Sequence, residues 1–143
     1  MENWTNISLD HFMKHLGECW LDMGASDPVY RMKVERNHLN PLKFTHGGLL
    51  SAFLDATMGD ACFRACDERH CFTLSLTTNF VATSHLGEMI FSKPIITKRT
   101  AHLCYATATV TNEKDRIIAT ACGVWKPIKK SLTKRIYYRE QKN

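Results

Sequence analysis

The sequence predicts an α+β domain in which one long buried helix packs against an antiparallel sheet that curls around it. Residues 48–63 are mostly Leu, Ala, Phe and Met and include no Pro, a pattern typical of a helix that is apolar on nearly all sides. Later segments rich in Thr, Val, Ile, Phe and Ala are separated by short polar turns, a pattern typical of strands. One helix and a sheet of about five or six strands form a single layered unit.

The length and charge of the chain limit its organisation and its partners. A chain of 143 residues forms one domain, spanning residues 1–143, that buries roughly two-thirds of the surface of its unfolded state. The net charge of +5 favours an anionic partner, but much of it lies in a basic tail from about residue 127. The sequence indicates no nucleic-acid-binding fold, and no segment approaches the ~18 apolar residues of a membrane span. Since the N-terminus lacks a basic and apolar leader, we expect a cytoplasmic protein without nucleic-acid or membrane partners.

Two elements are expected before the long helix. Residues 8–21 place apolar side chains at helical spacing, with Ser8 as the N-cap, and predict a short amphipathic N-terminal helix. Residues 28–37 alternate apolar and charged side chains, and predict a strand with one solvated face. We expect the short helix to pack on the sheet.

The remaining strands are expected after the long helix, at residues 71–83, 87–98, 101–111 and 117–126. The polar segments 84–87 and 112–115 are typical of hairpin turns, and predict that these strands form an antiparallel meander. Pro94 interrupts one strand and requires an edge position or a bulge, because proline donates no ladder hydrogen bond.

The candidate site lies where a loop meets the long helix. Asp55 sits within the apolar helix, where an ionised carboxylate is costly unless it is paired, so its presence indicates a function rather than packing. Gly47 and Gly48 precede it and let a ligand approach the backbone. The first N–H groups of the helix have no internal partner and carry positive partial charge. Together these features predict an oxyanion site near a carboxylate.

This arrangement resembles the PaaI-like branch of the hotdog-fold acyl-CoA thioesterases, through Asn40, His46, Gly47, Gly48 and Asp55 at the spacing of that family. The resemblance implies hydrolysis of an acyl- or aryl-CoA thioester without a metal or redox cofactor. It assigns Asp55 the role of general base or nucleophile, which the sequence does not separate, and the Gly47 N–H the role of oxyanion donor. One departure is Lys43, which stands where family members commonly have Gly.

The resemblance also suggests roles for residues outside the motif. Thr73 occupies the position of a Ser or Thr that orients the attacking water or the carboxylate. We expect His46 to fix the start of the helix and to orient the Asn40 loop rather than to transfer protons. The segments that contain Ser84, His85, Lys98 and Arg99 could be solvated hairpin tips, but by resemblance they lie near CoA, whose phosphates suit Lys98 and Arg99.

Helix geometry predicts that the working unit contains at least two chains. Gly47 and Asp55 are eight residues apart, about 12 Å along a helix, which is too far for one thioester carbon to meet both. Two antiparallel copies related by a two-fold axis would bring Gly47 of one beside Asp55 of the other. The family is also built in this way, so we expect a homodimer with shared sites, assembled as a dimer of dimers.

The sequence also leaves a metal site and two other functions as alternatives to this interpretation. Cys62, Cys66, His70 and Cys71 form a metal-like cluster near Asp67, but it lacks a second paired half, so no zinc site is expected. The six cysteines are instead expected to be small buried residues in a reducing compartment. A non-catalytic acyl-CoA-binding hotdog protein and a hotdog dehydratase acting on acyl carrier protein are the alternative functions, although the dehydratase His-Phe-Pro loop is absent from the sequence.

Overall fold

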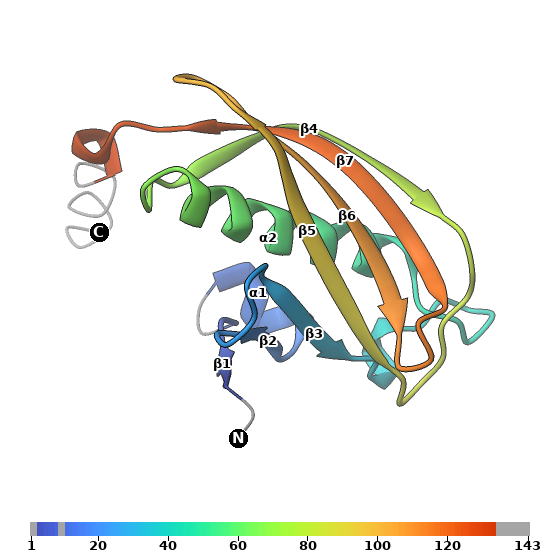
Figure 1. Ribbon diagram of the computed structural model, residues 1–143. Helices are drawn as coiled ribbons and strands as arrows, with labels where there is room; N and C mark the ends of the chain where they lie inside the picture. The colour runs from blue at the N-terminus through green and yellow to red at the C-terminus, as the bar shows by residue number, and fades with distance from the viewer. Residues whose placement is uncertain (1–2, 9–10, 134–143) are drawn as a thin grey trace, which may run out of the picture.

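The computed structural model describes residues 3–8 and 11–133. At its centre lies the helix α2 (Gly47–Ala65), and Figure 1 shows the sheet curving over this helix. The short helix α1 (His11–Leu16) and the 3-10 helix η1 (Arg36–His38) complete the helical elements of the described chain. The predicted α+β architecture is therefore confirmed, with more strands than expected.

A single antiparallel sheet contains all seven strands of the described chain, in the spatial order β1-β2-β3-β5-β6-β7-β4. The strands are β1 (Trp4–Asn6), β2 (Cys19–Asp22), β3 (Val29–Lys33), β4 (Cys71–Phe80), β5 (Met89–Arg99), β6 (Cys104–Asn112) and β7 (Ile117–Pro127).

The N-terminal segment differs from the prediction of one helix over residues 8–21. The helix α1 ends at Leu16, because Gly17 follows it with a positive φ of 111°, and the chain then enters β2. Cys19 and Leu21 are buried through strand alternation instead of helical spacing. The Ser8 hydroxyl accepts a hydrogen bond from the Cys19 N–H (3.0 Å), so it ties this segment together and is not the expected helix N-cap.

The predicted meander is wrong at its first turn. β4 pairs with β7, whereas β5 pairs with β3 and β6, so residues 84–87 form a crossover between distant strands instead of a hairpin. The second turn is a hairpin as predicted, since β6 pairs with β7 and the Asn112 side chain accepts two hydrogen bonds within the turn. Pro94 occupies the expected edge position, because β3 pairs with β5 only over residues 89–92.

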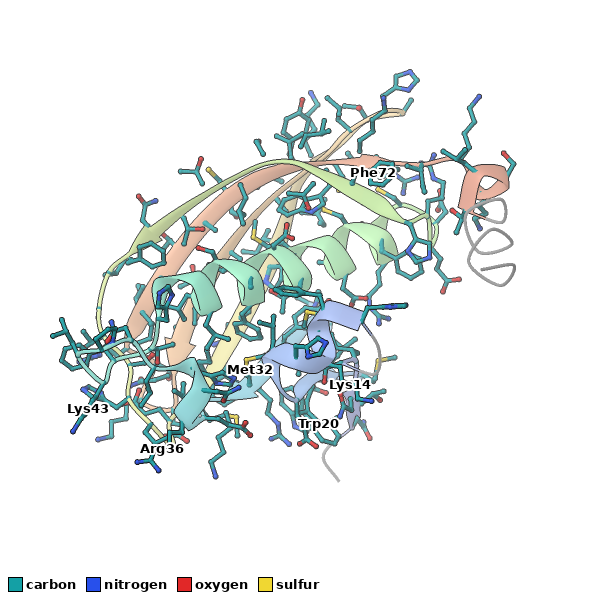
Figure 2. The ribbon with its side chains drawn as sticks, turned by 180° about the vertical axis from the view of Figure 1, so that it is seen from behind. Lys14, Trp20, Met32, Arg36, Lys43 and Phe72 are labelled. Carbon is teal, nitrogen blue, oxygen red and sulfur yellow. The ribbon has the colours of Figure 1, made fainter. Side chains whose placement is uncertain are left out.

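The helix α2 is buried on one face rather than on nearly all sides. β4 runs along one side of it and the N-terminal segment lies on the other, as Figure 2 shows from behind. The flank between them carries small, incompletely buried residues, namely Gly48, Ala52, Ala56 and Gly59. Across the described residues, no helix is long and apolar enough to cross a membrane. The buried residues of α2 are Leu49, Leu50, Phe53, Leu54, Thr57, Met58, Ala61 and Cys62.

Candidate active site

The loop before α2 is shaped by the side chain of Asn40. Its Oδ1 atom accepts hydrogen bonds from the N–H groups of Leu42 (3.0 Å) and Phe44 (3.1 Å). This tight loop requires Lys43 to adopt a left-handed conformation with a φ of 66°, which costs a non-glycine residue roughly 1–2 kcal/mol. The conformation explains why a glycine suits this position in the family that the sequence resembles.

His46 fixes the beginning of α2, as the sequence predicts. Its Nδ1 atom accepts a hydrogen bond from the Gly48 N–H (2.8 Å), which makes His46 the N-cap of the helix. The Gly48 N–H is therefore used inside the chain. In contrast, no hydrogen bond among the described residues uses the Gly47 N–H. Gly47 thus supplies the open donor at the positive end of the helix.

Asn40 and Gly47 meet at one cavity of about 370 Å³. The Phe80 ring covers Gly47 so closely that a Cβ atom on Gly47 would lie 3.1 Å from Phe80 Cζ. No local sequence pattern indicates Phe80 as a site residue, because it lies on a strand 33 positions after the helix start that it covers. The remaining lining residues are Phe44, Thr45, Leu50, Val81, Ala82 and Thr83.

Asp55 lies two turns further along α2, where it contacts β4. The Thr73 hydroxyl donates a hydrogen bond of 2.7 Å to Asp55 Oδ1, which supports the register that placed Thr73 beside this carboxylate. Within residues 3–8 and 11–133, no hydrogen bond reaches Asp55 Oδ2. The side chain is partly exposed, so the expected burial of Asp55 within an apolar helix is incomplete in the single chain. The site therefore contains a carboxylate that Thr73 positions through Oδ1, while Oδ2 has no hydrogen-bond partner among the described residues.

Comparisons with known proteins place these features in a family. The model of the thioesterase superfamily matches residues 42–119, which is more than half of the chain. The chain belongs to the thioesterase superfamily. No curated protein matches its sequence significantly.

Solved structures of this superfamily fold include thioesterase superfamily member 2 of zebrafish, which is 22% identical at a TM-score of 0.75, over 83% of this chain and 87% of that chain. The PaaI protein of E. coli, from the phenylacetic acid degradation operon, is 20% identical at a TM-score of 0.75, over 85% of this chain and 86% of that chain. A hypothetical thioesterase protein from Streptococcus pneumoniae, solved with coenzyme A, is 19% identical at a TM-score of 0.69, over 77% and 85% of the two chains. The predicted hotdog fold is confirmed.

In this superfamily member, Ser84 and His85 support the Asn40 loop. Ser84 is 1% exposed, and its hydroxyl donates a hydrogen bond of 2.6 Å to the Thr45 hydroxyl, so it does not face a substrate in the single chain. His85 lies 3.2 Å from Glu88 and contacts the Phe44 ring edge-on, with 5.4 Å between ring centroids. Both predicted binding residues therefore have structural partners.

Lys98 and Arg99 lie at the other end of α2, and only one of them is open to a ligand. The Arg99 guanidinium donates to the Ala65 carbonyl at the end of α2 and pairs with Asp67 at 2.8 Å. Lys98 is exposed, and no ion pair between described residues includes it. A phosphate would thus compete with Asp67 for Arg99 but not with an internal partner for Lys98.

The cysteines near this end of α2 are packed thiols. Cys62, Cys66 and Cys104 are fully buried and Cys71 is partly buried. Burial raises the pKa of Cys71 to about 12, so its thiol keeps its proton at neutral pH. Among the described residues, no three His, Cys, Asp or Glu side chains converge as metal ligands. Cys122 differs from the expectation of burial, because it is exposed on β7.

The cap geometry predicts how His46 variants behave. Asparagine is a favourable N-cap and alanine is not, so His46→Ala should lose about 1 kcal/mol of unfolding free energy while His46→Asn loses little. Denaturant unfolding measures both values. Because His46 acts as a cap, His46→Asn should also keep most thioester hydrolysis. A folded but inactive His46→Asn variant would instead show that the imidazole takes part in the chemistry.

Proposed function

We propose that this protein hydrolyses acyl- or aryl-CoA thioesters to the free acid and CoA. The observation that carries this proposal is the Asp55 carboxylate, which Thr73 holds through one oxygen while the other stays open. Membership of the thioesterase superfamily supports thioester hydrolysis as the general reaction. The Streptococcus pneumoniae neighbour, solved with coenzyme A, supports CoA as the thiol part of the substrate.

The site residues divide the chemistry between them. Asp55 acts on the thioester carbonyl, either by activating water or by direct attack. The Gly47 N–H, at the positive end of α2, stabilises the oxyanion that then develops on the carbonyl oxygen. The Asn40 amide lies in the same cavity as Gly47 and orients the thioester. His46 keeps Gly48 occupied and so leaves Gly47 as the donor.

A second copy of the chain completes each site. Along α2, Gly47 and Asp55 are about 12 Å apart at 1.5 Å per residue, so one carbonyl group does not reach both within a single chain. An antiparallel pair of α2 helices about a two-fold axis would join Gly47 of one copy to Asp55 of the other.

The surface beside the site has features that favour binding of a second copy of the chain. β4 is an edge strand of ten residues, and it exposes Phe72 (53%), Leu74 (56%) and Phe80 (57%). A long apolar edge favours pairing with another strand. The neighbouring flank of α2 carries the small residues from Gly48 to Gly59 described above, which let two helices approach closely. Phe72 begins this edge at the end of the molecule opposite Lys43, as Figure 2 shows.

The proposed chemistry predicts the behaviour of Asp55→Asn. Asparagine keeps the size and can still accept from Thr73, but it has no charge with which to act as a base or nucleophile. The value of kcat for acyl-CoA hydrolysis should fall by at least ~100-fold, measured by release of free CoA thiol. Asp115→Asn, at an exposed hairpin, is the matched control and should hydrolyse normally. Near-normal hydrolysis by Asp55→Asn would place the chemistry elsewhere.

The shared site predicts complementation between two inactive variants. Asn40→Asp keeps an oxygen that accepts the loop N–H groups but replaces the amide donor with a negative charge, and Asp55→Asn lacks the carboxylate. After the two are unfolded together and refolded, one site of each mixed dimer carries both changes and the other carries none. Random pairing should then restore roughly a quarter of wild-type activity. Mixed dimers that form without restoring activity would show that each site lies within one chain.

Lys98 forms no ion pair with another described residue, and its exposed charge predicts a role in holding the CoA phosphates. Lys98→Ala should raise KM for acyl-CoA, most strongly at low salt, because a surface charge attracts a phosphate less when ions screen it. Hydrolysis of a pantetheine thioester without the nucleotide should be unchanged. Lys114→Ala, at the exposed hairpin between β6 and β7, provides the control. Equal losses on both substrates would rule out the assignment to phosphate.

A further inference from the structure

Trp125 carries a buried hydrogen-bond donor that the proposed chemistry does not use. Its side chain is 1% exposed, and its indole Nε1–H has no hydrogen-bond partner within the described chain. A buried indole N–H usually finds a partner, because an unpaired donor keeps the cost of losing its water. A phenylalanine or leucine would fill the core without that cost, so packing alone does not account for an indole at this position.

Two contacts place Trp125 next to the Asp55 carboxylate. On β7, Trp125 is the direct partner of Thr73 on β4, and opposite residues of paired strands have Cβ atoms about 5 Å apart on one face of the sheet. The Thr73 side chain points to α2, where it donates to Asp55. On α2, the indole reaches Gly59, which lies one turn beyond Asp55 and only about 40° around the helix from it. The indole therefore lies on the same side of α2 as the carboxylate.

The missing side chain of Gly59 leaves space beside the indole N–H, called here the Gly59 notch. A Cβ atom at Gly59 would lie 3.4 Å from Trp125 Nε1. Outside the helix itself, the only other described heavy atom within 4 Å of that position is Trp125 Cδ1, at 3.9 Å. Gly59 also lines a cavity of about 310 Å³ together with Ala56, so a small molecule can approach it. A group that enters the Gly59 notch finds the Trp125 N–H as a donor.

A second glycine fixes the direction of the indole. A Cβ atom at Gly123 would lie 2.6 Å from Trp125 Cη2 and 2.7 Å from Cζ3, so the six-membered ring occupies the space of a side chain there. The indole is therefore held at both ends, by Gly123 at the six-membered ring and by Gly59 at the nitrogen. A donor fixed in position before a ligand arrives loses less conformational entropy when the ligand binds.

The Gly59 notch lies between this donor and an acceptor that is also unused. Asp55 Oδ2 accepts no hydrogen bond within the described residues, and Cβ atoms four residues apart on a helix are about 5–6 Å from each other. One water molecule can span this distance, because it can donate to the carboxylate oxygen and accept from the indole N–H. The water would then have the two polar partners that a bound water requires.

Two antiparallel copies of α2 would bring the thioester carbonyl to the same place. Gly47 of one copy meets Asp55 of the other, and Gly47 is the first residue of its helix. The position one turn beyond Asp55 therefore faces the loop before the partner helix, not the helix itself. The second chain would thus enclose the Gly59 notch together with the oxyanion donor instead of filling it.

We propose that Trp125 is a catalytic residue that holds the hydrolytic water against Asp55 through its indole N–H. This inference rests on the proposed function, and it selects activation of water over direct attack by the carboxylate. Asp55 Oδ2 takes a proton from the water as the water oxygen bonds to the carbonyl carbon, whose oxygen the Gly47 N–H of the other copy stabilises. The C–S bond then breaks, its electron pair leaves with the sulfur, and the proton on Asp55 passes to the CoA thiolate.

The test compares Trp125→Phe with Trp125→His. Both variants replace the indole with a smaller ring, but only the imidazole keeps a ring N–H. At a pH of about 8, where an ordinary imidazole is neutral, Trp125→Phe should lower kcat for acyl-CoA hydrolysis roughly 10-fold and leave KM within roughly 3-fold of wild type. Trp125→His should regain most of that loss. Equal losses in the two variants would show that only packing is disturbed, and would overturn the inference.

Gly59→Ala tests the notch without changing a core side chain. Alanine favours a helix over glycine, and its Cβ atom would meet Trp125 at an ordinary contact distance, so the free energy of unfolding should be equal or higher. The methyl group would displace the water, so kcat should fall roughly 10-fold while sedimentation shows the oligomeric state of wild type. Wild-type kcat in a folded Gly59→Ala variant overturns the inference, even if the Trp125 variants do not fold.

A single turnover in heavy-oxygen water separates this inference from the proposed function. With enzyme in excess over acyl-CoA, the label should enter the released acid and not the protein. Label found in Asp55 would mean that the carboxylate attacks directly, so the proposed function would stand and the role of Trp125 would fail. If wild type hydrolyses no acyl-CoA thioester, both fail. Asp115→Asn serves again as the control and should match wild type in rate and in labelling.

Discussion

One helix carries both the open Gly47 N–H and the Asp55 carboxylate, and their separation of about 12 Å governs the rest of the proposed site. A rigid helix does not bend to bring two such groups to one carbonyl. The curved sheet leaves one flank of α2 uncovered beside the edge strand β4. The separation of the two groups prevents one chain from acting alone. The uncovered flank is the surface on which a second chain can complete the site.

Many polar residues around α2 are already engaged inside the chain. His46 caps the helix start, Ser84 is bonded to Thr45, and Arg99 holds the last turn through Ala65 and Asp67. Among residues 3–8 and 11–133, no hydrogen bond uses the Gly47 N–H or Asp55 Oδ2, and both groups belong to α2. This division separates residues that position the site from residues that can contact a substrate.

Local features were predictable from the sequence, and long-range pairing was not. The helix after His46 and the hairpin at Asn112 follow from residues close in the chain, through capping and turn chemistry. Cys19 fits helical spacing with Leu16 and strand alternation with Leu21, so only the pairing of β2 with β3 decides between the two. The turn at residues 84–87 looks like a hairpin, but non-local pairing of β4 with β7 overrides it. The contact of Thr73 with Asp55 was reached through the family resemblance, whereas the contact of Arg99 with Asp67 had no sequence signal.

The central claim is that the Gly47 N–H of one chain binds the carbonyl oxygen, while Asp55 of its partner acts on the carbonyl carbon directly or through an activated water. The most direct measurement is a crystal structure of the protein with a CoA thioether that carries a ketone in place of the thioester carbonyl. The account predicts that the ketone oxygen lies within hydrogen-bond distance of the Gly47 N–H of one chain and that the ketone carbon lies beside Asp55 of the other. A ketone that contacts Gly47 and Asp55 of the same chain, or neither residue, would contradict it.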